Sequence, residues 1–193
     1  MKIYIVTGGT MEKILSKKQI MTVPNLLSLL RFVMIPFIVW LYIKENYYGA
    51  AAMVILSGIT DIADGFIARK FNMISDFGKI LDPVADKFTQ CALIISLSLK
   101  YHEIVWLIVL FVIKECIMGL LGYITIKSKD SVNSAKWYGK LSTFVLYAVM
   151  LILIVLPELS ITFVRILVVL CGLVLALSLV MYTRFYVKIL SEK

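Results

Sequence analysis

The chain has 193 residues, a length that favours one domain. Its residues are 61% hydrophobic and 17% charged, with a mean hydropathy of +0.96, whereas soluble domains have roughly 45 to 50% apolar and about 25% charged residues. This composition excludes a soluble globule, and 10 Gly, 4 Pro and 3 Cys exclude a collagen-like fibre and a disulfide scaffold. The net charge of +8 could indicate a nucleic-acid partner, but in so apolar a chain the positions of the charges matter more.

Residues 1–20 precede the long apolar stretches, so we predict an N-terminal extension followed by a membrane domain over residues 21–193. Within the extension, Met11, Ile14 and Leu15 share one side of a helix that carries lysines elsewhere. This pattern favours a helix that lies on an anionic membrane surface.

A helix needs roughly 20 mostly apolar residues to cross the hydrocarbon core of a bilayer. Six stretches have this character, and Thr22 and Asn25 are candidate N-caps of the first. Because the polar connections are short, we predict an all-α integral membrane protein that is a six-transmembrane-helix bundle. The predicted spans are about Leu26–Ile43, Ala50–Phe66, Ile80–Leu99, Ile104–Ile126, Leu141–Leu156 and Ile161–Thr183.

Basic residues indicate the orientation, because they concentrate in loops on the cytosolic side. Fifteen of the 20 lie in the N-terminal segment, around the second and fourth connections and at the C-terminal end. The opposite side has Lys44 and Lys100, and Arg31, Lys114 and Arg165 lie inside spans. We therefore expect a multi-pass protein of the cell membrane with both termini in the cytosol, and the basic excess requires no nucleic acid.

The three cysteines are far apart, and each lies inside an apolar run. Their spacing suggests neither a metal site nor redox chemistry. We interpret Cys91, Cys116 and Cys171 as small buried hydrophobic residues.

Acidic residues crowd the second and third spans. Asp61 lies about 11 residues, or roughly 17 Å, beyond Ala50 at the outer end of its span, where an ionised side chain costs at least about 2.5 to 3.5 kcal/mol. Helical spacing collects the acids and glycines on two faces, one with Asp61, Asp64, Gly65 and Ala68 and the other with Gly78, Asp82 and Asp86.

A short link between the two spans would bring these faces together. Four converging carboxylates repel one another unless some are protonated or cations lie among them. Oxygen ligands without nearby histidine or cysteine thiolate select Mg²⁺, Mn²⁺ or Ca²⁺, and a pair of magnesium ions that holds phosphates is the favoured interpretation. A cation or proton pathway is the alternative, since intramembrane carboxylates are also typical of transporters.

The run Asp61-x2-Asp64-Gly65-x2-Ala68-Arg69-x8-Gly78-x3-Asp82-x3-Asp86 closely resembles the signature of the CDP-alcohol phosphotransferase family. Members of that family transfer a phosphate-linked group from a CDP-alcohol to the hydroxyl of an acceptor and release CMP. The resemblance implies that two Mg²⁺ or Mn²⁺ ions are bound by Asp61, Asp64, Asp82 and Asp86, and that Asp86 is also the general base. It further implies contacts to the donor nucleotide and its diphosphate from Asp64, Gly65, Ala68, Arg69 and Gly78.

The segment from Thr22 to Arg31 resembles the start of bacterial members that use glycerol phosphate. The resemblance therefore implies CDP-diacylglycerol as donor, sn-glycerol 3-phosphate as acceptor and phosphatidylglycerophosphate and CMP as products. It also implies a homodimer in the lipid bilayer, and we expect the polar cavity of each bundle to open to the cytosol. Phosphatidylglycerol (for cardiolipin synthesis), serine and inositol phosphate remain alternative acceptors, and a cation or proton transporter is the alternative outside the family.

Cations inside or beside the later spans are candidates for binding the acceptor's phosphate. Where glycerol-phosphate-using members have an Arg-Glu pair, this chain has Lys114-Glu115, and lysine lacks the bidentate fork of arginine. Adjacent positions do not face each other on a helix, so we expect Lys114 and Glu115 to have partners on other helices. The acceptor-binding candidates are Lys114, Lys136, Lys140 and, with a structural role as the alternative, Arg31.

Overall fold

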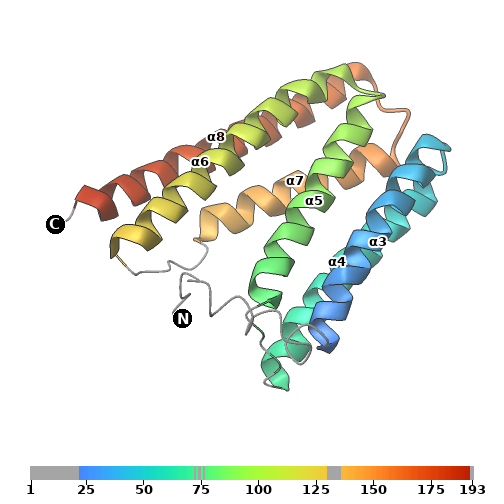
Figure 1. Ribbon diagram of the computed structural model, residues 1–193. Coiled ribbons are helices and arrows are strands. Elements are labelled where there is room, and N and C mark those ends of the chain that lie inside the picture. The colour runs from blue at the N-terminus through green and yellow to red at the C-terminus, as the bar shows by residue number, and fades with distance from the viewer. Residues whose placement is uncertain (1–21, 72, 74, 76, 130–135, 192–193) are drawn as a thin grey trace. The chain divides into compact units, whose positions relative to one another are not determined.

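The computed structural model describes residues 22–71, 73, 75, 77–129 and 136–191, and the regular elements in that part of the chain are all helices (Figure 1). The interfacial helix predicted within residues 1–20 lies outside the described residues. The described elements are α3 (Val23–Ile43), α4 (Tyr47–Lys70), α5 (Gly78–Ser98), the 3₁₀ turn η1 (His102–Ile104), α6 (Val105–Lys129), α7 (Trp137–Val155) and α8 (Ile161–Ser191).

Side-chain caps explain why α3 and α4 begin before the apolar runs. Thr22 Oγ1 accepts the N–H of Asn25 at 3.4 Å, which confirms Thr22 as the N-cap of α3. Pro24 lies in the first turn, where its missing N–H leaves no intrahelical bond unmade. Asn46 caps α4 in the same way, because its Oδ1 accepts the N–H of Gly49 at 3.0 Å.

Helices α4 and α8 extend furthest past the ends that hydropathy predicted. The sequence predicted that the spans end at Phe66 and Thr183, whereas α4 reaches Lys70 and α8 reaches Ser191. Basic residues occupy both last turns, where they interact favourably with the negative end of the helix dipole. Hydropathy predicts only the apolar part of a helix that can lie in the hydrocarbon core. The helix itself continues as far as its backbone hydrogen bonds do.

Five of these helices are long and apolar enough to cross a membrane, namely α3, α4, α6 extended by η1, α7 and α8. They give the chain the character of a multi-pass membrane protein. The predicted third span corresponds to α5, which has sufficient length but carries Asp82, Asp86 and Lys87 near its start. These charges distinguish α5 from the other five helices.

The helices form two compact units, residues 5–96 and, for the most part, residues 97–193. In the first unit, α3 and α4 pack along each other, as Figure 1 shows. Phe32 of α3 meets Phe88 of α5 with ring centroids 5.7 Å apart. These contacts bring the polar residues of three helices into one unit.

In the second unit, α8 packs against both α6 and α7. Two contacts hold the N-terminal end of α8 and the connection before it near η1: Tyr101 Oη donates to Pro157 O at 2.9 Å, and Arg165 Nε donates to Glu103 Oε1 at 3.2 Å. Because the side chain of Arg165 is 65% exposed, this pair has the character of a surface salt bridge.

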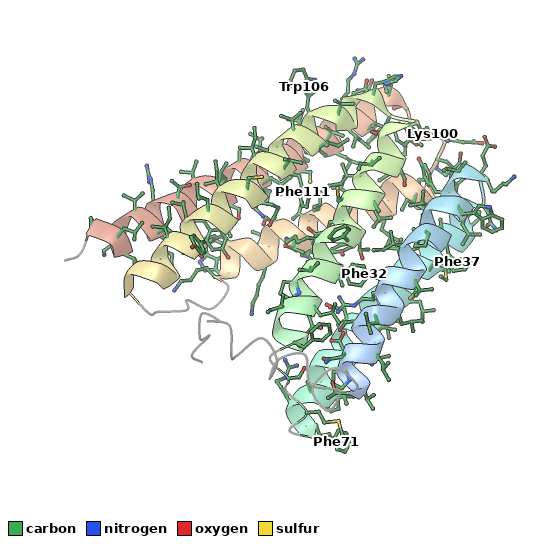
Figure 2. The ribbon with its side chains drawn as sticks, in the orientation of Figure 1. Phe32, Phe37, Phe71, Lys100, Trp106 and Phe111 are labelled. Carbon is green, nitrogen blue, oxygen red and sulfur yellow. The ribbon has the colours of Figure 1, made fainter. Side chains whose placement is uncertain are left out.

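Apolar side chains are exposed along the outer faces of all the long helices. Phe37 and Trp106 are examples, with exposed fractions of 54% and 77% (Figure 2). Such surfaces are suited to contact with lipid. Among the cysteines, Cys171 is fully buried, as predicted, but Cys116 is exposed on α6, so the prediction that it is buried is wrong.

Candidate functional site

The first unit gathers charged residues from three helices. Asp61 and Asp64 lie three residues apart on α4, and Asp82 and Asp86 lie four residues apart on α5, so each pair shares a helical face. The third helix, α3, contributes Arg31, whose side chain is 2% exposed. The charges predicted from the sequence therefore meet around a buried cation.

Arg31 forms ion pairs with two aspartates and approaches a third. Its Nη1 pairs with Asp61 Oδ1, its Nη2 lies 2.9 Å from Asp64 Oδ2, and the same Nη2 lies 3.8 Å from Asp82 Oδ1. The sequence indicated Arg31 as a candidate for the acceptor's phosphate. The structure places its guanidinium against the aspartates.

Ser28 is a second polar residue of α3 at this place, and the sequence analysis missed it. Its hydroxyl is fully buried and within hydrogen-bonding distance of Asp64 Oδ2, at 3.2 Å, and of Asp82 Oδ1. It also lies 3.1 Å from the carbonyl oxygen of Pro24. Ser28 and Arg31 are three residues apart and hence on one helical face, which is the signal that could have found it.

Asp86 lies one turn beyond Asp82 on α5. Its Oδ2 accepts the Nε2–H of Gln90 at 2.9 Å and lies 4.0 Å from Lys87 Nζ. It is close enough to Asp61 for the two charges to interact. Asp86 thus belongs to the same charged region, beside the three aspartates that surround Arg31.

Among the described residues, the balance of charge leaves this region negative. Three carboxylates face the guanidinium of Arg31, and the fourth, Asp86, lies beside them with Lys87 at its edge. Two like charges 4 Å apart repel by about 4 kcal/mol at an effective dielectric constant of about 20. Further positive charge would therefore stabilise the cluster.

The donor set fits a hard divalent cation. Carboxylate and hydroxyl oxygens are the ligands that Mg²⁺ and Ca²⁺ prefer, and the chain's one histidine, His102, lies in the other unit. Within the described residues, however, no three acidic, histidine or cysteine side chains are already arranged to hold one ion. Each of the three carboxylates that contact Arg31 does so through one oxygen, so an ion would be held by the other oxygens.

The glycines of the signature lie close to this cluster. Gly78 begins α5, and its N–H donates to Ser75 Oγ at 2.9 Å, while Ser75 Oγ donates to Asn25 Oδ1 at 3.0 Å. On α4, a Cβ at Gly65 would lie 3.6 Å from Arg69 Nη1, an ordinary contact distance, so the Arg69 guanidinium folds back over Gly65. The two glycines therefore differ, because only Gly78 is closely packed.

The acceptor candidates Lys114, Lys136 and Lys140 belong to the second unit. Lys114 Nζ lies 2.7 Å from Glu115 Oε1, so the prediction that these neighbours would not pair with each other is wrong. Adjacent helical positions point in different directions, but the four-carbon stem of lysine allows its ammonium group to reach the carboxylate. Lys114 is nevertheless buried, with an exposed fraction of 4%.

Lys136 and Lys140 lie at the start of α7. The backbone N–H of Lys136 donates to Tyr182 Oη of α8 at 3.2 Å, and its Nζ lies 4.3 Å from the ring centroid of Phe185. Lys140 is exposed. A tyrosine of α8 thus fixes the beginning of the helix that carries both lysines.

Comparison with known proteins assigns the chain to a family. A family model described as CDP-alcohol phosphatidyltransferase matches residues 21–180, which include all four aspartates and every helix up to most of α8. The chain belongs to this family of membrane enzymes. Family members generally use divalent metal ions, and their substrates are CDP-diacylglycerol and an alcohol.

Several relatives indicate what similar chains do. The CDP-diacylglycerol--glycerol-3-phosphate 3-phosphatidyltransferase of Aquifex aeolicus is 34% identical over 148 residues, which cover 76% of this chain and 83% of that protein. A probable phosphatidylglycerophosphate synthase of Mycobacterium tuberculosis is 36% identical over 151 residues, covering 75% and 71%. A CMP-forming cardiolipin synthase of Streptomyces coelicolor is 29% identical over 143 residues, covering 70% and 66%.

Proposed function

We propose that this protein transfers the phosphatidyl group of CDP-diacylglycerol to sn-glycerol 3-phosphate, forming phosphatidylglycerophosphate and CMP. The observation that carries the proposal is the cluster of Asp61, Asp64 and Asp82 around one cation, on the positions of the family's signature. The relatives from Aquifex aeolicus and Mycobacterium tuberculosis, named for this activity, support the choice of acceptor.

The four aspartates would hold Mg²⁺ or Mn²⁺ ions, two in number. When bound, these ions supply positive charge that neutralises the donor's diphosphate and the departing CMP. Asp61, Asp64 and Asp82 would hold the ions through carboxylate oxygens, and Asp86 lies beside them. Ions held there would favour a phosphate-rich donor.

Asp86 has the role of general base. It accepts the proton of the acceptor's hydroxyl, whose oxygen forms a bond to the phosphorus that carries diacylglycerol while the bond from that phosphorus to CMP breaks. Gln90 donates to one carboxylate oxygen of Asp86 and so holds the side chain in place. For this step, Asp86 must come within about 2.6 to 3.2 Å of the oxygen that loses the proton.

Other signature residues bind the donor. The backbones at Gly65, Ala68 and Gly78 pack against the nucleotide, and Arg69 binds a donor phosphate from its position on the exposed end of α4. Asp64 contributes to the same donor site.

For the acceptor's phosphate we propose Lys114, Lys136 and Lys140. Lys114 is buried beside Glu115, so it is held in one orientation. The lysines of α7 lie at its first turn, where Tyr182 fixes the backbone. The ion pairs of Arg31 with the aspartates favour a different role for that residue.

The proposal includes a membrane arrangement. We infer that α5 is a sixth span whose charged start lines a polar cavity open to the cytosol, with both termini on that side and residues 1–20 as an extension to the membrane domain. The excess of basic residues at the cytosolic connections supports this orientation. A homodimer stays a prediction from the family resemblance.

The test is an acceptor panel with purified protein in lipid nanodiscs. CDP-diacylglycerol and Mg²⁺ or Mn²⁺ are supplied with glycerol 3-phosphate, phosphatidylglycerol, serine or inositol phosphate in turn, and CMP and the lipid product are measured. Of the four acceptors, we expect only glycerol 3-phosphate to cause CMP release. Because the Streptomyces coelicolor relative is named a cardiolipin synthase, phosphatidylglycerol is the second candidate acceptor. No CMP with any acceptor would refute the enzyme class and favour a transporter.

A further inference from the structure

Arg31 and Ser28 of α3 contact the same carboxylates from one side. Both touch Asp64 Oδ2, and both approach Asp82 Oδ1. Arg31 also pairs with Asp61 Oδ1. Within the described part of the chain, each of these three aspartates makes its polar contacts through one carboxylate oxygen. The second oxygen of each aspartate can therefore bind another ligand.

The residues of α3 are more buried than two of the aspartates that they contact. Ser28, Arg31 and Asp64 are 0%, 2% and 3% exposed, whereas the side chains of Asp61 and Asp82 are 47% and 41% exposed. The residues of α3, together with Asp64, therefore lie on the buried side of Asp61 and Asp82. The exposed side is the one that an entering ion or diphosphate can reach.

We propose that Ser28 and Arg31 are positioning residues, which hold one oxygen of each of Asp61, Asp64 and Asp82 so that the other oxygen is presented to the divalent ion. This inference rests on the proposed function, since it takes these aspartates as metal ligands. Residues that hydrogen-bond to metal ligands commonly set the orientation of those ligands, and their loss typically lowers metal affinity by about 10- to 100-fold.

The planar fork of arginine matters in this role. Nη1 and Nη2 of one guanidinium reach carboxylates on two positions of α4 at once, and Nη2 also approaches α5. A lysine ammonium is a single point charge that cannot bridge three separate oxygens in the same fixed geometry. The guanidinium also offsets part of the aspartates' mutual repulsion before any ion binds.

The test uses variants that keep the charge. Removing the charge of Arg31 would by itself strengthen attraction of a cation, so Arg31→Lys and Ser28→Ala isolate the effect of position. Mn²⁺ binding is measured by electron paramagnetic resonance on the purified full chain without substrate, and turnover is measured over a range of Mn²⁺ concentrations. Arg165→Lys and Ser96→Ala are matched controls, at the surface salt bridge with Glu103 and at a buried serine that bonds the backbone of its own helix.

We expect Arg31→Lys to weaken Mn²⁺ binding by about 10- to 100-fold and Ser28→Ala by about tenfold, with turnover recovering as Mn²⁺ is raised. The KM for glycerol 3-phosphate at saturating Mn²⁺ should stay unchanged, as should Mn²⁺ binding in both controls. Unchanged or tighter Mn²⁺ binding in both α3 variants would overturn the inference, and so would a raised acceptor KM with normal Mn²⁺ binding. A wild-type protein that binds no Mn²⁺ would instead refute the metal site itself.

Discussion

Gly78→Ala should destabilise the protein, because there is no room for a side chain at the start of α5. A Cβ at this position would lie 2.5 Å from Asn25 Oδ1 and 3.0 Å from Ser75 Oγ. Both neighbours are buried, with exposed fractions of 1% and 8%. The methyl group would therefore displace at least one of them.

The magnitude follows from what must move. Adding a methyl group to a well-packed interior costs about 1 to 3 kcal/mol, and each of the two hydrogen bonds that link Gly78, Ser75 and Asn25 contributes about 0.5 to 1.5 kcal/mol. Alanine regains at most about 1 kcal/mol of helix propensity. The net loss of unfolding free energy should be about 2 kcal/mol, which lowers the melting temperature by roughly 4 to 8 °C in a chain of this size.

Thermal unfolding of purified protein in detergent measures this loss, with Gly58→Ala as the matched control. Position 58 is also in a helix, but a Cβ there would meet no atom within 4 Å. Gly58→Ala should therefore melt at or slightly above the wild-type temperature. If Gly78→Ala melted as high as Gly58→Ala, the close packing of Asn25 and Ser75 against Gly78 would be refuted.

Three further predictions concern the site. Asp86→Asn should retain CDP-diacylglycerol binding, measured by calorimetry, while CMP release falls by about 10²- to 10⁴-fold; undiminished turnover would remove its assignment as general base. Asp61→Asn should weaken Mn²⁺ and donor binding together, and a change in only one of them would separate the metal site from the donor site. Tyr182→Phe removes the acceptor for the N–H of Lys136 and should cost about 1 to 3 kcal/mol of stability and raise the acceptor KM; an unchanged KM would argue against a role of the α7 lysines.

The aspartate positions could be predicted from sequence because they depend on local regularities. Spacings of three and four residues place Asp61 with Asp64, and Asp82 with Asp86, on a helical face wherever the helices lie. Hydropathy likewise marks long apolar helices, because crossing a bilayer requires a minimum length of apolar chain. The sequence counted α5 as a sixth such helix, but the charges in its first half separate it from the five helices that are apolar enough to cross a membrane.

The partner of a side chain is harder to predict from sequence when the side chain is long and flexible. Helical geometry separates Lys114 from Glu115, yet the length of the lysine chain lets the two groups meet at 2.7 Å. Similarly, the apolar surroundings of Cys116 in sequence do not tell which side of α6 faces its neighbours. Spacing along the sequence predicts the direction in which a side chain leaves its helix, but it does not predict how far the side chain reaches or which neighbour it meets.

By itself, the sequence determined the class of the protein, its long apolar helices and the register of the four aspartates, because each of these follows from composition or from periodicity within one helix. Tertiary structure alone decided that Ser28 and Arg31 meet three of those aspartates, Asp61, Asp64 and Asp82. The contacts of Ser28 with Asp64 and Asp82 join positions 36 and 54 residues apart. They arise from the packing of α3 against α4 and α5, which no spacing along the chain encodes.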